Sequence, residues 1–206
     1  IVIPGMAIAI PGILRARMSE CEGSTMGLLR TLATSQAQLQ NQALVDQDAD
    51  GTGEYGLLNE LCGASNLRDD KGGCELSPVN PTFIAPAFRV TNPNGYATRY
   101  GYHFQVFLPH QGQVITDHPV TPKGSRDQES INAQETKWIV YAWPVKVNVT
   151  GTRCLAIDPS GEVFIASNCR PGGIGYYYSG SNGPAYYAAI KKSDYSASKV
   201  NSYIIP

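Results

Sequence analysis

Charged residues are scarce in this chain: Asp, Glu, Lys and Arg make up 16% of its 206 residues, against about a quarter in typical globular domains. The formal net charge is −1, so there is no excess of positive charge to attract nucleic acid or anionic lipid. The sequence also lacks a Gly-x-Ser-x-Gly nucleophile elbow, a phosphate-binding loop and a His-Glu-x-x-His zinc motif. These absences argue against a nucleic-acid partner, and we expect that the protein is not an enzyme.

No apolar run reaches the roughly 20 residues that a membrane-spanning helix needs. The first 14 residues, IVIPGMAIAIPGIL, are nevertheless uncharged and mostly apolar, and Arg15 and Arg17 follow at once. Such a segment must be buried in lipid or in other protein, which indicates a subunit that packs through its N-terminal helix. The side chains expected to make the assembly contacts are Ile1, Val2, Ile3, Met6, Ile8, Ile10, Ile13 and Leu14.

An amphipathic helix is predicted to continue to about residue 44. Its apolar positions, mostly three or four residues apart, are Leu14, Met18, Cys21, Thr25, Leu28, Leu32, Leu39 and Ala43. The opposite face, which we expect to be solvated, carries Arg15, Glu22, Arg30, Gln36, Gln40 and Gln42. Pro4 and Pro11 are expected to kink the helix or to melt a turn of it. The chain thus divides into an N-terminal helix, residues 1–44, and a globular head, residues 45–206.

The head shows β signals after a short helical piece at residues 57–61. Strands are predicted at residues 100–108, 137–147, 153–157 and 162–166, the second of them broken by Pro144. The sequence Asp-Pro-Ser-Gly between the last two strands has the composition of a hairpin turn. From Gly172 onward the composition predicts irregular surface structure. The expected fold class is α+β, with a long N-terminal helix packed on a small antiparallel sheet and a loop-rich C-terminal part.

Five cysteines raise the question of disulfides. Cys62 and Cys74 flank one Gly-rich loop, and Cys154 and Cys169 flank an apparent hairpin. Two local pairs, Cys62–Cys74 and Cys154–Cys169, are the simplest arrangement, although four cysteines allow three connectivities. These bonds would require an oxidising compartment outside the cytoplasm. Cys21 is left over on the helix, either unpaired or at a subunit contact.

The loop that follows the long helix contains the clearest group of chemically related residues. In Asp46-x-Asp48-x-Asp50-Gly51, alternate carboxylates provide the hard oxygen ligands that calcium prefers. In an EF-hand frame Thr52 would offer its carbonyl and Glu54 would occupy the ninth position. The twelfth position is Leu57, so the usual bidentate glutamate is missing and Glu60 would have to replace it. The alternative is an acidic, Gly-rich exit turn that binds no cation. Calcium is therefore the one cofactor that the sequence predicts.

The chain resembles the type IV pilin and type II secretion pseudopilin superfamily. The residues that carry the resemblance are 7–17, AIAIPGILRAR, which look like the stretch where the apolar pilin helix reaches a proline and basic residues follow. Residues 30–40, 46–56, 101–104 and 141–144 are similar to pilin-like proteins common in planctomycete-type bacteria. Pilins carry a glutamate at the fifth mature position, where this chain has Gly5. The processing site and that glutamate therefore either precede Ile1 or are absent.

The resemblance implies a structural function. We expect a subunit of a bacterial extracellular or cell-envelope filament, which polymerises with copies of itself through its apolar helix and resides in the inner membrane before assembly. One alternative is a pseudopilin of a type II secretion system. Another is a membrane-anchored, calcium-dependent adhesion or binding protein that does not polymerise.

Overall fold

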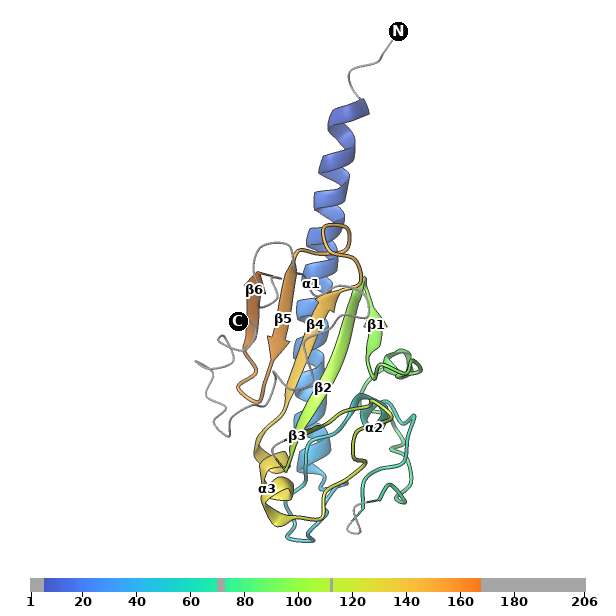
Figure 1. The fold of residues 1–206 in the computed structure, drawn as a ribbon, viewed down its shortest axis with the longest axis vertical. Coiled ribbons are helices and arrows are strands. Elements are labelled where there is room, and N and C mark those ends of the chain that lie inside the picture. The colour runs from blue at the N-terminus through green and yellow to red at the C-terminus, as the bar shows by residue number, and fades with distance from the viewer. Residues whose placement is uncertain (1–5, 70–72, 112, 168–206) are drawn as a thin grey trace.

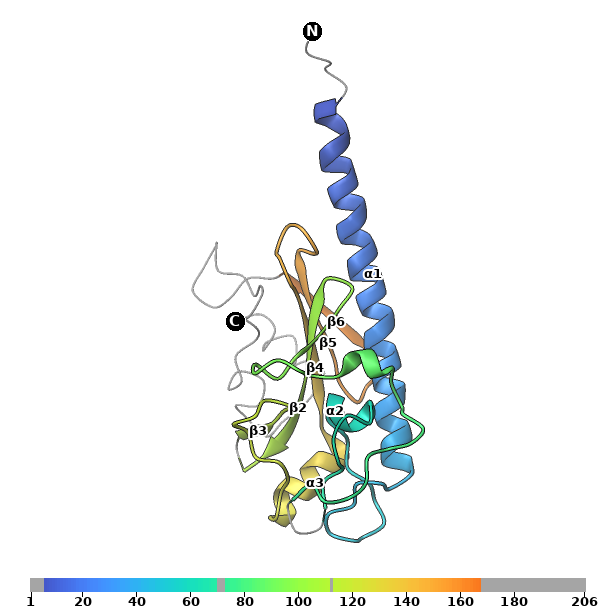
Figure 2. The same ribbon diagram turned by 90° about the vertical axis from the view of Figure 1, so that its right-hand side faces the viewer.

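A long helix and an antiparallel sheet form the protein, so its fold class is α+β (Figure 1). The structure, a computed structural model, describes residues 6–69, 73–111 and 113–167. Helix α1 comprises Met6–Asn41. Its first half projects beyond the head, and its second half lies along one face of the sheet (Figures 1 and 2). The predicted loop-rich part from Gly172 onward lies outside the described residues.

Helix α1 differs from the prediction at both ends. It runs through Pro11, so the expected melted turn does not occur there. It ends at Asn41, earlier than predicted, because Ala43 adopts a left-handed conformation with φ of 45°. The amide of Ala43 still donates to the Gln40 carbonyl, at 2.9 Å, and this bond closes the last turn.

The buried face of α1 is partly polar, which corrects the predicted division into a packed and a solvated face. Glu22 and Gln36 were both predicted to face solvent, but they are 5% and 0% exposed. The Gln36 side chain donates to the Gly56 carbonyl at 2.7 Å and accepts from the Gly56 amide at 2.8 Å. Polar groups on this face are tolerated because distant parts of the head satisfy their hydrogen bonds.

The sheet has six strands in the order β1-β2-β4-β5-β6, with β3 paired to β2, and all pairs are antiparallel. The strands are β1 (Ala97–Arg99), β2 (Tyr102–His110), β3 (Gln113–Ile115), β4 (Ile139–Pro144), β5 (Arg153–Ile157) and β6 (Val163–Ser167). The four predicted strands are present as β2, β4, β5 and β6. Strands β1 and β3 were not predicted.

Both faces of the sheet carry buried side chains. Phe104 and Val106 belong to the core that also contains Leu29 of α1. Phe107 belongs to a second cluster on the other face, together with Trp143. Strand β4 ends at Pro144, which lacks the amide hydrogen needed to continue the ladder.

Short helices complete the head. Helix α2 (Leu58–Leu61) lies where a helical piece was predicted, η1 (Pro86–Phe88) is a single 3-10 turn, and α3 (Gln128–Thr136) was not predicted. Asp127 caps α3, since its side chain accepts from the Ser130 amide at 2.9 Å.

The predicted Cys62–Cys74 disulfide is not formed, and both residues are free thiols. The Cys62 thiol donates to the Asn59 carbonyl at 3.6 Å, whereas the Cys74 thiol donates to the Lys123 carbonyl at 3.5 Å. The two sulfur atoms thus have partners on different segments. Cys169 lies outside the described residues, so the Cys154–Cys169 pair stays a prediction. Cys21 is a free thiol that packs, partly buried, against the core.

Candidate functional site

The projecting part of α1 is the first candidate site, because it exposes apolar side chains. Residues 12–17 are all exposed; Ile13 retains 67% and Leu14 38% of its accessible surface. Met6, Ile8 and Ile10 belong to the same helix, whereas Ile1, Val2 and Ile3 lie outside the described residues. Among the predicted assembly residues, Ile13 and Leu14 are the two whose side chains are described, and both are exposed enough to contact another molecule.

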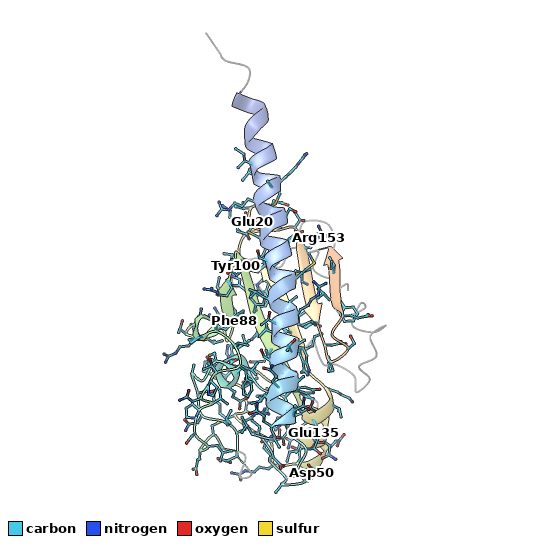
Figure 3. The ribbon with its side chains drawn as sticks, turned by 180° about the vertical axis from the view of Figure 1, so that it is seen from behind. Glu20, Asp50, Phe88, Tyr100, Glu135 and Arg153 are labelled. Atoms are coloured by element: carbon cyan, nitrogen blue, oxygen red, sulfur yellow. The ribbon has the colours of Figure 1, made fainter. Side chains whose placement is uncertain are left out.

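A buried carboxylate marks the place where α1 leaves the head. Glu22 Oε2 lies 2.8 Å from Arg153 Nε at the start of β5, and Glu22 Oε1 accepts from the amide and hydroxyl of Thr152 at 2.9 and 3.1 Å. Figure 3 shows Arg153 beside the middle of the helix. This contact fixes the helix to the sheet just below the exposed apolar segment.

The acidic loop is the second candidate site, and it lies at the opposite end of α1. Carboxylate oxygens of Asp46, Asp48 and Asp50 all lie within 4.8 Å of one another. Backbone amides shape the loop: those of Asp50 and Gly51 donate to Asp46 at 3.2 and 3.1 Å, and Gly51 has a φ of 90° that favours glycine. The turn therefore gathers three carboxylates on a short piece of backbone.

Two glutamates, Glu54 and Glu135, lie next to this loop on the side that faces the head. One oxygen each of Asp48, Glu54 and Glu135 lie within 4.8 Å of one another. Glu54 is fully buried; its Oε1 accepts from the Gln47 amide at 2.9 Å, but its Oε2 has no hydrogen-bond partner. Glu135 Oε1 is likewise buried without a partner. Figure 3 shows Glu135 and Asp50 close to the C-terminal end of α1.

The carboxylates of this cluster all carry negative charge and repel one another. Burial raises the pKa of Glu54, and the hydrogen bond from the Gln47 backbone only partly offsets that effect. The pKa of Glu135 is also raised, first by desolvation and then by the negative charges of Asp50, Asp48, Glu54 and Asp46. The two groups of three carboxylates share Asp48, and such a set of oxygens could hold a hard divalent cation.

The structure also places Glu60 and Thr52, two further residues that the EF-hand frame invoked. Glu60, the proposed replacement for the missing bidentate glutamate, is engaged elsewhere: its Oε1 lies 3.0 Å from Arg68 Nε and its Oε2 accepts from the Leu57 amide at 2.7 Å. Thr52 lies on the exposed side of the loop, where its amide donates to Asp50 Oδ1 at 2.6 Å. Glu135, not Glu60, lies beside Asp48 and Glu54, and sequence spacing gives no signal for it because it lies on α3.

A buried polar network supports this second site, and no motif in the sequence predicts it. Arg68 is fully buried and donates to Glu60, to the Gln134 side chain and to the Tyr55 carbonyl. Gln134 in turn donates to the Pro109 carbonyl and to the Ser125 hydroxyl, each at 2.7 Å. The network holds α3 in place, and α3 carries Glu135.

Comparison with family models, with curated proteins and with solved structures gives no match for this chain. Among the helices that the structure describes, none is both long and apolar enough to cross a membrane.

Proposed function

We propose that this protein is a subunit of a pilus-like filament that assembles through the N-terminal half of α1. The observation that supports the proposal is the exposure of Ile13 and Leu14 on a helix that projects from the head and carries no charge before Arg15. Burial of one such side chain contributes about 1.5–3 kcal/mol, so a bundle of these helices would gain a large free energy from their packing.

The geometry of the subunit suits head-to-tail assembly. A helix that extends beyond its own head can pack against the helices of subunits above and below it. Such a contact is heterologous, because it joins two different surfaces of the subunit. When it is repeated with a rotation that does not close into a ring, it produces an open helical fibre. Glu22 and Arg153 would hold each head at a fixed place along its helix.

The same design serves a short secretion pseudopilus, so filament length distinguishes the two assemblies. Negative-stain microscopy of native material should show long, uniform fibres for a pilus-like filament and short ones for a pseudopilus. Isolated particles would favour the membrane-anchored binding protein.

A paired substitution tests the assembly surface. Ile10→Asp combined with Ile13→Asp places two charges three residues apart, on one side of α1, and should abolish fibres without unfolding the head. The matched control is Leu76→Asp with Val120→Asp, because both residues are exposed on the head, at 42% and 81%. Circular dichroism should show folded heads in both variants. Fibres of unchanged abundance from the helix variant would refute assembly through α1.

A further inference from the structure

We propose that one calcium ion binds at the C-terminal end of α1 and fastens the loop that follows this helix to α3. The coordinating groups are the carboxylates of Asp46, Asp48, Asp50, Glu54 and Glu135. This inference goes beyond the filament proposal and does not depend on it, since every ligand belongs to a single chain.

The acidic loop alone would not support a site, but Glu54 supplies an independent observation. Its side chain is fully buried and its Oε2 has no hydrogen-bond partner, while one of its two oxygens lies within 4.8 Å of carboxylate oxygens of Asp48 and Glu135. A buried carboxylate oxygen without a partner is costly. Arg68 does not fill this role, because its Nε is paired with Glu60 at 3.0 Å. A bound cation would satisfy the unpartnered oxygens of Glu54 and Glu135 together.

The chemistry of the ligands selects the class of metal. The two clusters, Asp46-Asp48-Asp50 and Asp48-Glu54-Glu135, offer only oxygen atoms as ligands. They contain none of the nitrogen and sulfur ligands that are typical of zinc sites. Calcium accepts six to eight oxygens in flexible geometry, whereas magnesium requires a near-ideal octahedron and keeps several waters. Five carboxylates drawn from a turn and from a separate helix, together with solvent on the exposed side, fit the calcium pattern.

Existing contacts show which parts the ion would join. The Tyr55 amide donates to the Gln134 carbonyl at 3.0 Å, and the Gln40 side chain donates to the Glu135 carbonyl. The end of α1, the acidic loop and α3 therefore already meet here. A cation between Asp48 and Glu135 would add a strong ionic link at a point where the carboxylates otherwise repel one another.

The experiment is calcium titration of the purified chain after treatment with chelator, followed by thermal unfolding. At a hundredfold excess over the dissociation constant, calcium should raise the melting temperature of a chain of this length by about 5–10 °C. Magnesium at the same concentration serves as the comparison and should give a smaller shift. Superimposable melting curves in calcium and chelator would overturn the proposal, and an equal or larger effect of magnesium would overturn the choice of metal.

Glu135→Gln distinguishes a ligand from a merely structural residue. In chelator the variant should melt at or above the wild-type temperature, because the substitution removes one of five repelling charges. In calcium it should bind at least about tenfold more weakly and lose most of the stabilisation. The control is Glu129→Gln, on the exposed first turn of the same helix, which should keep the wild-type response. An unchanged calcium affinity in Glu135→Gln would remove Glu135 from the site.

Discussion

Arg68 is the residue whose replacement should most disturb the head. Its side chain is fully buried, its Nε lies 3.0 Å from Glu60 Oε1, and it also donates to Gln134 and to the Tyr55 carbonyl. In Arg68→Met the long apolar side chain fills much of the same volume, but Glu60 loses its counter-charge and two carbonyl groups lose their donor. Breaking a buried ion pair from one side costs about 3–5 kcal/mol.

That cost is a large share of the roughly 5–15 kcal/mol by which a domain is stable. Urea unfolding followed by circular dichroism, fitted with a common slope, measures the change in the free energy of unfolding. The matched control is Arg30→Met on the exposed face of α1, for which we expect a change within about 0.5 kcal/mol. Glu60→Gln in the Arg68→Met background should recover part of the loss, because it removes the stranded charge. If Arg68→Met costs no more than Arg30→Met, the inferred network does not stabilise the head.

Two further predictions concern the sheet and the acidic loop. Burial lowers the pKa of His103 from 6.5 to about 4, so the unfolded chain takes up this proton at a higher pH than the folded chain does. The free energy of unfolding should therefore fall by at most about 3 kcal/mol as the pH drops from about 6.5 to 4. His103→Gln should flatten this part of the pH–stability profile, and an unchanged profile in that variant would refute the attribution to His103. An added Cβ at Gly53 would lie 2.5 Å from the Gln40 carbonyl oxygen and 2.8 Å from Ala43 Cα, so Gly53→Ala should destabilise the chain by about 1–3 kcal/mol. The control is Gly27→Ala on α1, where an added Cβ would have no atom within 4 Å, and this substitution should be neutral or stabilising by up to about 1 kcal/mol. Equal melting temperatures for the two variants would contradict the tight packing inferred at Gly53.

The long helix and four of the strands could be predicted because each repeats its pattern over enough residues. Strands β1 and β3 have three residues each, too few for an alternation to be recognised. Helix α3, QESINAQET, has Ile131 as its one large apolar residue, so it shows hardly any amphipathic period. The one sequence signal for this helix is Asp127, a residue type that commonly caps helix N-termini.

The main difference between prediction and structure is the burial of polar residues, because the helical period placed Glu22 and Gln36 on the face opposite the apolar positions. Glu22 and Gln36 are buried since Thr152, Arg153 and Gly56 supply their partners from distant parts of the chain. The Cys62–Cys74 pairing failed for a related reason. Spacing along the chain says how long a loop is, but not which way its two thiols point.

The two candidate sites are separated along one helix, and this separation gives the two proposals independent tests. Glu22 fixes α1 to β5 below the exposed segment, while Gln36 and Gln40 hold its far end to Gly56 and to α3. The acidic loop lies beyond that far end, away from the exposed residues of the projecting half (Figure 3). Loss of apolar contacts at Ile13 would therefore leave the carboxylates in place, and loss of a ligand at Glu135 would leave the assembly surface intact. If a filament forms, the calcium site would act on it only through the head, by fixing the end of α1 to α3.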